Sequence, residues 1–491
     1  MTDLNITAPF AQHARALADK PALVHGGRVV LYRELDPLVR RTAAHLYALG
    51  LEPGEVVGVA LKDSIEHIVI LCAMARAGIV MLPLDWRWTP AEQERVLEHF
   101  GAVAALIEPG RPQPEGFRCL AVDESWAREL SAKGFQSVAF PEGDVPLLMS
   151  LSSGTTGRPK GPRLRHSQFM ARYRVFCINL GFHSQDRFLS ATPLYFGGGR
   201  TFPLAMLYMG GTVFMLPPPY EPQELCEAVE RHHITNLFLV PTLIRRLMTL
   251  PDEKLAPLKG MRLLVSSGSA LHPDERREIR KRVCPSFIEY YSSTEGGGVS
   301  FLTPEDADEF GDSVGRPVFG VEVQCVDESH RPLPPGEVGR IRYRGPAVAE
   351  GFWNDAEATR ESFREGWWYP GDLGMMDQHG YLYLKGRAKD MIIRGGVNIY
   401  PAEIEAVLQA HPGVADVSVV GWPSREFNEE VAAFVILKKA GSVEPEELKS
   451  LCRDKLAPYK VPKQVFVVQE FPRNTLGKVI KSELSARLPS L

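Results

Sequence analysis

Residues 151–161 have the sequence Leu-Ser-Ser-Gly-Thr-Thr-Gly-Arg-Pro-Lys-Gly, and they directly follow an apolar run at 145–149. The hydroxyl and backbone N–H groups of this stretch are hydrogen-bond donors. Its three glycines let the main chain approach an anion closely, because they lack a Cβ atom. The Arg and the Lys add positive charge. The pattern therefore predicts a buried strand that leads into a loop for a polyphosphate.

Two other interpretations of this loop fit less well. A Walker A loop has four residues between its glycines and continues with Gly-Lys-Ser/Thr, whereas Lys160 lies between Pro159 and Gly161. A Ser/Gly-rich surface linker seldom combines a Thr-Thr pair, a Gly-Arg-Pro-Lys-Gly run and a preceding apolar strand. The loop therefore indicates phosphate binding through a different motif.

The composition is that of a soluble globular protein with more than one core. A chain of 491 residues is too long for one ordinary core, so two or more subdomains are expected. The net charge of −4 argues against nucleic acid as the main partner. The seven cysteines show no CxxC spacing, so we expect no zinc site, no disulfide framework and a cytoplasmic location. The longest apolar stretch, Ile68 to Leu84, is interrupted by Arg76 and Gly78, so no membrane-spanning helix is expected.

Strands and helices are expected to alternate along the first 145 residues. An amphipathic helix is expected at 64–77, and Thr89 with Pro90 predicts the start of another, with the Thr as N-cap. The alternation predicts an α/β fold with a parallel, doubly wound sheet. No GxGxxG motif follows these strands, which gives a dinucleotide site no support. Strands are expected at 55–61, 79–84 and 103–107.

Two later strands are expected to end in small hydroxylated residues. The run 261–265 continues into Ser-Ser-Gly-Ser at 266–269, and the run 286–291 continues into Ser-Ser-Thr-Glu at 292–295. Small side chains at the carboxyl end of a strand leave a flat shelf for a planar ring. Open α/β sheets bind their ligands at this edge.

These motifs resemble the adenylate-forming superfamily, which includes acyl-CoA synthetases, nonribosomal-peptide adenylation domains and luciferases. Loop 151–161 meets every fixed position of the family pattern Thr/Ser-Ser-Gly-Thr-Thr-Gly-x-Pro-Lys-Gly, and residues 472–478 match Pro-Arg-x-x-x-Gly-Lys. The resemblance covers about residues 20–485. It implies a large N-terminal domain at 1–388, with two doubly wound subdomains and a β-subdomain, and a small mobile C-terminal α+β domain at 389–491.

The resemblance implies that the N-terminal domain binds ATP and Mg²⁺. Tyr291 would stack on the adenine, Thr294 would donate to the α-phosphate as a catalytic residue, and Glu295 would hold Mg²⁺. One carboxylate suffices, because Mg²⁺ prefers one or two carboxylates with phosphate oxygens and water. Ser292 stands where the family usually has Gly. The other expected nucleotide contacts are Ser152, Ser153, Gly154, Thr155, Thr156, Gly157, Lys160, Ser267, Gly268, Ser269, Tyr290, Ser292 and Ser293.

Two further positions of the resemblance concern the ribose and the hinge. Asp372 would accept both ribose hydroxyls and Arg387 would contact the ribose, although Pro370 replaces the Thr that the family usually has in this segment. A plain Asx-type turn is the alternative for Asp372. Lys389 is the expected hinge about which the C-terminal domain rotates.

The C-terminal domain would serve both steps of the reaction. Lys478 would neutralise the charge that develops during adenylation, as a catalytic residue. A lone exposed Lys is usually only a solvated charge, but here the surrounding octapeptide fits the family. After the rotation, Gly395 and Gly396 would line a tunnel for the pantetheine arm of coenzyme A.

The acid is expected to bind around residues 195–200. The family has a Pro-Leu-aromatic-His segment here, and this chain has Phe196 in place of the His. No Asp or Glu occurs between Thr192 and Tyr220, which argues against an amino-acid substrate because burying an ammonium without a counter-charge is costly. We therefore expect an apolar pocket for an aromatic, cyclic or medium-chain acid. Its expected lining residues are Tyr195, Phe196, Gly197, Arg200 and Gly297.

Arg200 has two interpretations. It could pair with the second carboxylate of a diacid. It could instead be a structural Arg, which is the commoner role and is favoured here. A preference for dicarboxylic over monocarboxylic acids would distinguish the two.

The resemblance implies a two-step ligase reaction. A carboxylate attacks the α-phosphate of ATP to give an acyl-adenylate and pyrophosphate, and the thiol of coenzyme A then takes the acyl group. The partners are thus a small carboxylic acid, ATP and CoA, without nucleic acid or a membrane span, and a homodimer is allowed. The main alternative is a standalone adenylation enzyme that loads a carrier-protein phosphopantetheine. A luciferase-like oxygenase or a silent ATP-binding protein is a third, disfavoured by the intact Thr294, Glu295 and Lys478.

Overall fold

The computed structural model describes residues 4–132, 138–151, 160–269, 271–395, 397–473 and 478–488. It divides into two units: unit 1 comprises Met1–Glu322 and Tyr343–Trp368, and unit 2 comprises Val323–Arg342 and Tyr369–Leu491. The mixed α/β architecture, with a large N-terminal part and a C-terminal part, confirms the predicted fold class. The boundary expected between residues 388 and 389 is the hinge about which the C-terminal domain would rotate, and it stays a prediction.

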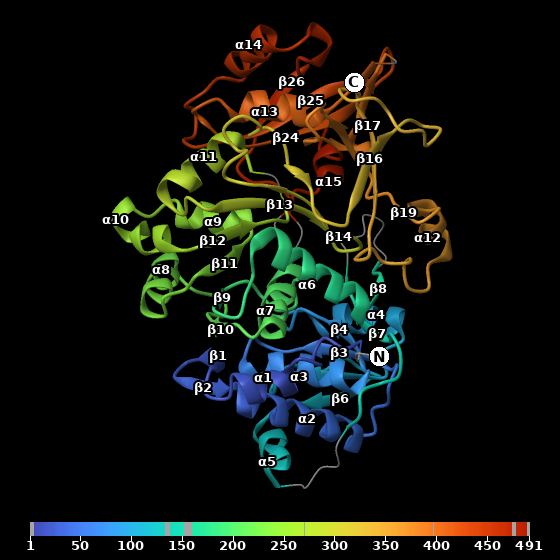
Figure 1. The fold of residues 1–491 in the computed structure, drawn as a ribbon. Helices are drawn as coiled ribbons and strands as arrows, with labels where there is room; N and C mark the ends of the chain where they lie inside the picture. Colours follow the sequence, from blue (N-terminus) through green and yellow to red (C-terminus); the bar gives the residue numbers. More distant parts are fainter. Residues whose placement is uncertain are drawn as a thin grey trace. The chain divides into compact units, whose positions relative to one another are not determined.

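Nine strands form the first sheet of unit 1, and most of them are parallel. Parallel neighbours run from β1 through β10, β9, β11 and β12 to β13, whereas β2, β14 and β15 are added antiparallel. Figure 1 shows β9, β11 and β12 side by side in the green part of the ribbon. In sheet order the strands are β15 (Arg316–Pro317), β14 (Gly297–Leu302), β13 (Phe287–Ser293), β12 (Leu263–Ser266), β11 (Asn236–Leu239), β9 (Arg187–Ser190), β10 (Thr212–Met215), β1 (Pro21–His25) and β2 (Arg28–Leu31).

Six strands form the second sheet of unit 1. In sheet order they are β6 (Arg118–Ala121), β5 (Ala104–Ile107), β3 (Val56–Ala60), β4 (Val80–Pro83), β7 (Pro146–Met149) and β8 (Arg163–Arg165). All neighbours are parallel except β7 and β8. The strands predicted at 55–61, 79–84 and 103–107 are β3, β4 and β5, and the strand predicted before the loop at 151–161 is β7.

Helices connect these strands, and α4 begins as predicted. The Thr89 hydroxyl accepts the main-chain N–H of Glu92 at 3.3 Å, and Pro90 is the first helical residue. Pro fits there because its missing N–H would have no partner in the first turn. The helices of unit 1 are α1 (Phe10–Ala16), α2 (Tyr32–Ala48), α3 (Ile65–Ala77), α4 (Pro90–Phe100), α5 (Glu124–Ala132), α6 (His166–Leu180), α7 (Gly197–Met209), α8 (Pro222–Arg231), α9 (Pro241–Leu247), α10 (Asp252–Leu255), α11 (Pro273–Arg282) and α12 (Ala356–Ser362).

Helix α3 corrects one detail of the sequence prediction. The helix is present, but it is not amphipathic: Glu66 is its one residue that is not buried. The reason is that α3 packs on α2, on β4 of the second sheet and on β1 of the first sheet. A helix enclosed on all sides has no face that must be polar.

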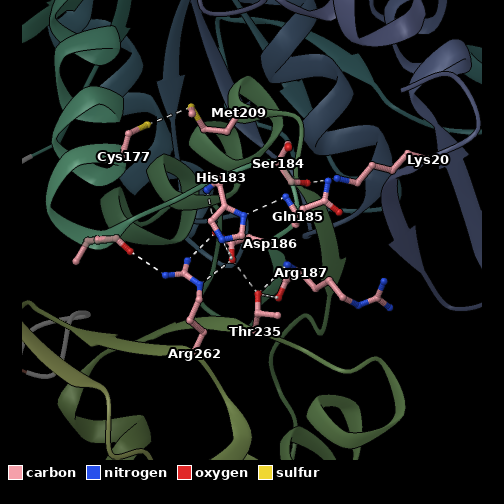
Figure 2. Close-up of polar contacts among 11 residues, drawn as sticks. Lys20, Cys177, His183, Ser184, Gln185, Asp186, Arg187, Met209, Thr235 and Arg262 are labelled. Atoms are coloured by element: carbon pink, nitrogen blue, oxygen red, sulfur yellow. Dashed lines mark hydrogen bonds and ion pairs between the residues drawn. The ribbon is translucent and has the colours of Figure 1, made fainter. Parts of the chain in front are cut away.

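Asp186 ties together the amino ends of three parallel strands, β9, β11 and β12 (Figure 2). Arg262 donates to its carboxylate from Nε at 3.0 Å and from Nη2 at 2.7 Å, and the Thr235 hydroxyl donates at 3.2 Å. The main-chain N–H of His183 adds a further hydrogen bond at 3.0 Å. The side chain of Asp186 is fully buried. This network fixes the edge of the sheet opposite to the predicted shelf.

An antiparallel region follows the first sheet, as expected. Strand β17 (Gly339–Arg344) contributes to both units: Tyr343 pairs with Trp368 in unit 1, and Gly339 pairs with Gly374 in unit 2. Unit 1 also has the antiparallel pair β18 (Phe363–Arg364) and β19 (Trp367–Trp368). In unit 2, β20 (Asp372–Met376) pairs antiparallel with β21 (Leu382–Arg387). Strand β16 (Glu322–Val326) pairs with β17.

Unit 2 has a hydrophobic core of its own between a sheet and helices. Strands β24 (Val414–Ser424) and β25 (Asn428–Leu437) form a long antiparallel pair, and β25 also pairs with β26 (Gln464–Val467) in parallel. Pro401 opens α13 (Pro401–Gln409), as predicted. Unit 2 also contains β22 (Ile392–Arg394), β23 (Val397–Ile399), α14 (Pro445–Lys455) and α15 (Lys481–Ser485).

Candidate functional site

Ser267 and Ser292 meet at the carboxyl ends of two neighbouring strands. Ser267 follows β12 and Ser292 lies near the end of β13, and their hydroxyl oxygens are 2.9 Å apart. This hydrogen bond gives the Ser at 292 a partner that the usual Gly would lack. Gly268 has a φ of +109°, a conformation that residues with a side chain rarely adopt, and Ser269 beside it is exposed. The small residues thus share one edge of the sheet, and their contact with a nucleotide stays a prediction.

Tyr290 and Tyr291 point to opposite faces of β13, because side chains alternate along a strand. Tyr290 is 7% exposed, and its ring stacks on Phe301 with 4.5 Å between the centroids. Tyr291 is partly exposed. The burial of Tyr290 in an aromatic core argues against its predicted contact with the nucleotide, whereas the stacking of Tyr291 on the adenine stays a prediction.

The Thr294–Glu295 pair lies in a turn that several hydrogen bonds hold. The Ser293 hydroxyl accepts the main-chain N–H of Gly296 at 2.9 Å and lies 2.7 Å from the hydroxyl of Tyr343. The carbonyl of Glu295 accepts the N–H of Ala349 at 2.8 Å. Glu295 itself is 7% exposed. The turn therefore presents a carboxylate and a hydroxyl beside the shelf.

Arg172 also holds this turn, and the sequence analysis missed it. Its Nη2 donates to the carbonyls of Thr294 at 3.0 Å and Glu295 at 3.4 Å. The side chain is buried, and this burial lowers the pKa of its guanidinium below the ordinary value. No local pattern marks Arg172, because its partners are 122 and 123 residues further along the chain.

The segment Leu194–Tyr195, which is predicted to adjoin the acid, is clamped from two sides. Nη1 of Arg200 donates to the carbonyls of Leu194 at 2.9 Å and Tyr195 at 3.1 Å. Arg200 is 2% exposed, and this burial lowers its pKa to about 10. Both oxygens of the Asp63 carboxylate accept the N–H of Leu194, at 3.1 and 3.2 Å. These contacts favour the structural role for Arg200 over the binding of a diacid.

The glycines that follow Phe196 differ in the space around them. A Cβ at Gly197 would meet nothing within 4 Å, whereas one at Gly198 would lie 2.5 Å from the ring of Phe238. The ring of Phe196 reaches to 3.9 Å from the position that a Cβ at Gly268 would take. Phe196, which is predicted to line the acid pocket, therefore lies next to the small residues that are predicted to carry a planar ring.

In unit 2, the two predicted ribose contacts are partners of each other. Asp372 on β20 lies opposite Arg387 on β21, and Arg387 Nε is 3.0 Å from Asp372 Oδ1. Their side chains are 13% and 48% exposed, respectively. A carboxylate held beside a guanidinium is fixed in its orientation, which suits the recognition of hydroxyl groups. The alternative of an isolated turn residue is thereby disfavoured for Asp372.

The other predicted residues are placed as follows. Lys160 Nζ lies 5.9 Å from the centroid of the Phe352 ring, and Lys389 lies in the short turn Ala388–Asp390. Gly395 has a φ of +55° and donates its N–H to the carbonyl of Phe427 at 2.7 Å. Lys478 is partly buried and belongs to unit 2. Ser152, Ser153, Gly154, Thr155, Thr156, Gly157 and Gly396 lie outside the described residues.

Comparison with known families gives two matches along the chain. Residues 10–353 match the model for AMP-binding enzymes, and residues 403–478 match the model for the C-terminal domain of AMP-binding enzymes. The chain belongs to the AMP-binding enzyme family.

Full-length relatives of this AMP-binding enzyme are ligases. Feruloyl-CoA synthase from an Amycolatopsis species is 34% identical, over 97% of both chains. Indoleacetate–CoA ligase from Aromatoleum aromaticum is 32% identical, over 96% of both. Fatty acid–[acyl-carrier-protein] ligase ScoC from Streptomyces coeruleorubidus is 31% identical, over 97% of this chain and 95% of that protein. The ATP-bound structure of MatB from Rhodopseudomonas palustris is 29% identical and has a TM-score of 0.92, over 99% of this chain and 98% of that one.

These similarities confirm several predictions. The adenylate-forming superfamily and its acyl-CoA synthetase branch were identified correctly, and the chain is an enzyme of the AMP-forming CoA ligase class. Its similarity to an ATP-bound structure supports ATP as a substrate. Within the described ranges, no helix has the length and apolar character needed to cross a membrane, as expected.

AMP-binding enzymes are expected to use Mg²⁺ beside ATP, and the residues at the turn fit this ion. The described part of the chain contains no group of three or more His, Cys, Asp or Glu side chains that could hold a metal. Glu295 instead supplies one buried carboxylate next to Thr294. A single carboxylate suits a cation that takes its other ligands from phosphate and water.

Proposed function

We propose that this AMP-binding enzyme activates an aromatic carboxylic acid as its acyl-adenylate and transfers the acyl group to coenzyme A. The observation that carries the proposal concerns the segment that follows β9. In this segment the Phe196 ring lies beside Gly268, and Gly197 faces open space. An apolar wall with room beside it suits a planar ring, and offset ring contacts add to the gain from burial. The feruloyl-CoA and indoleacetate relatives are named for acids of this class.

A single carboxylate on the acid fits the charges around this wall. Arg200 uses Nη1 on main-chain carbonyls and is 2% exposed, so this nitrogen is not available for a second carboxylate. We therefore propose a monocarboxylic aromatic acid.

The residues act by position and charge. In adenylation the acid oxygen displaces pyrophosphate from the α-phosphate, so no nucleophile from the protein is needed. Thr294 donates to the α-phosphate, and Tyr291 carries the adenine. Mg²⁺, held by Glu295, supplies charge neutralisation on the phosphates when it is bound. Asp372 and Arg387 hold the ribose, and Lys478 contacts the developing charge until the C-terminal domain, residues 389–491, rotates at Lys389.

A second candidate function is the loading of a carrier protein. The ScoC relative is named for an acyl-carrier-protein substrate, and it covers the same length of this chain as the CoA ligases do. The thiol of a carrier-bound phosphopantetheine has the same chemistry as that of CoA. The two functions therefore differ only in what surrounds the pantetheine arm.

Pyrophosphate release with a panel of acids, with and without CoA, tests the proposal. Ferulate, indoleacetate and benzoate should be adenylated faster than an octanoate or a malonate, and CoA should raise turnover and appear in a thioester. Faster turnover with octanoate, or with malonate, would refute the aromatic assignment. Adenylation that CoA leaves unchanged, while a phosphopantetheinylated carrier protein accelerates it, would favour the second function.

Lys478→Ala tests the two-step scheme. Preorganised charge of this kind is worth ~3–4 kcal/mol, or roughly 10²–10³ in rate, so adenylation should slow by about that factor. Thioester formation from presynthesised acyl-adenylate and CoA should remain near the wild-type rate, because Lys478 has then moved away. Equal losses in both half-reactions would contradict the rotation at Lys389.

We also propose a cytoplasmic location and a homodimer. The seven cysteines are all free thiols, which is usual for proteins of a reducing compartment. Fractionation of cells that express a tagged chain tests the location. Light scattering of the purified protein tests the dimer, which a mass of 54.6 kDa in solution would refute.

A further inference from the structure

Arg172 is a buried cation in unit 1 whose acceptors are main-chain carbonyls. It lies on α6, which packs against β14, and it is 7% exposed. Its Nη2 donates to Thr294 at 3.0 Å, to Ala347 at 3.3 Å and to Glu295 at 3.4 Å. One guanidinium thus joins the catalytic turn to the segment that follows β17.

The same helix makes a second contact one turn earlier. The side-chain amide of Gln168 donates to the carbonyl of Val348 at 2.9 Å, and positions four apart lie on one face of a helix. A Cβ at Gly297 would come within 3.0 Å of Arg172 Nε, so this glycine packs closely against the Arg172 side chain. Arg172 is therefore held in one orientation by its surroundings.

Stability alone does not explain an Arg in this place. Burying a charge is costly unless an opposite charge or several hydrogen bonds compensate for it, and an apolar residue of similar size is often at least as stable. Burial lowers the pKa of this guanidinium, because the charged form loses its contacts with water. Glu295 is among the groups whose negative charge favours the cation. The Arg and the carboxylate that is expected to hold Mg²⁺ therefore stabilise each other.

We propose that Arg172 is a positioning residue for the adenylation step, which fixes the main chain of Thr294 and Glu295 so that their side chains meet the nucleotide phosphate and its Mg²⁺. This inference rests on the proposed function for the roles of these two side chains. Each carbonyl that Arg172 holds sets the orientation of one peptide unit, and thereby the direction of the neighbouring side chain. Displacement of a reacting group by about 1 Å can cost roughly 10² in rate.

The test uses the full chain with Arg172→Met and Arg172→Lys, and with Arg174→Met as a matched control. Arg174 lies on the same helix two residues further on, and it is exposed. Calorimetry measures the affinity for ATP with and without Mg²⁺. The rates of pyrophosphate release and of thioester formation from presynthesised acyl-adenylate are measured separately.

Arg172→Met should reduce the Mg²⁺-dependent gain in ATP affinity by roughly 10–100-fold, the usual effect of losing a group that orients a metal ligand. Pyrophosphate release should slow by a similar factor, and thioester formation from the adenylate should stay near the wild-type rate. For Arg172→Lys, the Mg²⁺-dependent gain in ATP affinity and the rate of pyrophosphate release should lie between those of the wild type and Arg172→Met. The reason is that an ammonium keeps the charge but lacks the planar fork of donors. Arg174→Met should match the wild type.

An unchanged Mg²⁺-dependent gain in folded Arg172→Met would overturn the inference, and so would equal losses in both half-reactions, as a general structural role predicts. If Arg172→Met does not fold, Arg172→Lys decides: wild-type values for the Mg²⁺-dependent gain and for pyrophosphate release would overturn it. The binding measurement needs no acid. Failure of the wild-type enzyme with every acid would therefore count against the proposed function and not against this inference.

Discussion

Two aspartates hold the chain at and beyond the ends of strand β9: Asp186, which is fully buried, at the amino end, and Asp63, whose side chain is 10% exposed, after the carboxyl end. At the amino end, Asp186 receives two donors of Arg262, the Thr235 hydroxyl and a main-chain N–H (Figure 2). At the carboxyl end, the Asp63 carboxylate accepts one main-chain N–H, that of Leu194, with both oxygens. A carboxylate that faces a guanidinium fork is compensated for the loss of water, and one that faces a single amide is much less so.

The pKa of Asp63 reflects this difference. Burial raises it from 3.8 to about 7, against the opposing hydrogen bond from Leu194, and the negative charge of Asp85 raises it further. The amino end of β9 is thus arranged for stability. The carboxyl end keeps a less well compensated carboxylate beside the segment that is proposed to hold the acid. At β9, the cost in stability therefore falls at the edge where the ligands are proposed to bind.

The largest effect is expected from Asp186→Ala at the amino end. Removing one partner of a buried ion pair costs about 3–5 kcal/mol, and because Arg262 is 35% exposed and can regain water, the lower end of this range is expected here. The free energy of unfolding in urea should fall by about that amount, and the KM for ATP of the folded enzyme should not change. A loss below about 1 kcal/mol would break the comparison. Asp186→Asn, which keeps an acceptor for Thr235, should lose less.

Glu295→Gln tests the carboxyl edge, where a substitution should affect the rate of adenylation more than stability. Loss of the carboxylate that is proposed to hold Mg²⁺ should slow adenylation by roughly 10²–10³, since fixed charges at a transferring phosphoryl group are worth about that much. The free energy of unfolding should change far less than in Asp186→Ala. Pyrophosphate release at saturating Mg²⁺ and a urea titration measure the two quantities. A variant that loses stability but keeps its rate would assign Glu295 to the structure alone.

Asp63→Asn sharpens the comparison through pH. Asn still accepts the N–H of Leu194, but it cannot ionise. Because the pKa of Asp63 is raised to about 7 in the folded state, the folded protein holds a proton that the unfolded chain loses near pH 4, so this group lowers wild-type stability as pH rises from about 4 to about 7. The variant lacks that loss, and it should be up to roughly 4 kcal/mol more stable than the wild type at about pH 8, with little difference below about pH 4.

Urea titrations of both proteins across this pH range measure the effect. A difference in unfolding free energy that does not depend on pH would show that Asp63 is ionised throughout. Arg87, whose positive charge opposes the shift, would then be the main influence on the Asp63 carboxylate.

The smallest effect is expected at Gly197, where a side chain would enter open space. Gly197→Val should raise the KM for an aromatic acid by roughly tenfold, because the added volume narrows the pocket, and should leave the KM for ATP unchanged. Gly198→Ala is the contrast: its methyl group would overlap the Phe238 ring and lower stability instead. Equal KM values for the acid in Gly197→Val and the wild type would remove Gly197 from the pocket.

Local rules were sufficient for much of the fold. The Thr89–Pro90 pair predicted the start of α4, and the short β-branched runs predicted β3, β4 and β5, because caps and strand propensities act within a few residues. The amphipathic character assigned to α3 was wrong. A hydrophobic pattern cannot show that a helix is covered by two sheets.

The candidate site was predicted only in part. The small residues at the carboxyl ends of β12 and β13 and the Asp372–Arg387 pair were found through motifs. Arg172 and Asp63 were missed, because each acts on main-chain groups more than 120 residues away, as the separations of 122 and 131 residues show. Every residue type has the same main-chain carbonyl, and nearly every type has the same N–H, so no pattern of residue types predicts such a contact.

Helix α3 has a consequence for the recombination of related enzymes. It packs on β1 from the first sheet and on β4 from the second, with nearly every residue buried, so a change of one methyl group is transmitted to both sheets. A crossover point between residues 25 and 80 would separate the helix from one of the surfaces that shaped it. Hybrids assembled from two relatives should therefore inherit residues 21–83 as a single block, whichever parent provides the acid pocket.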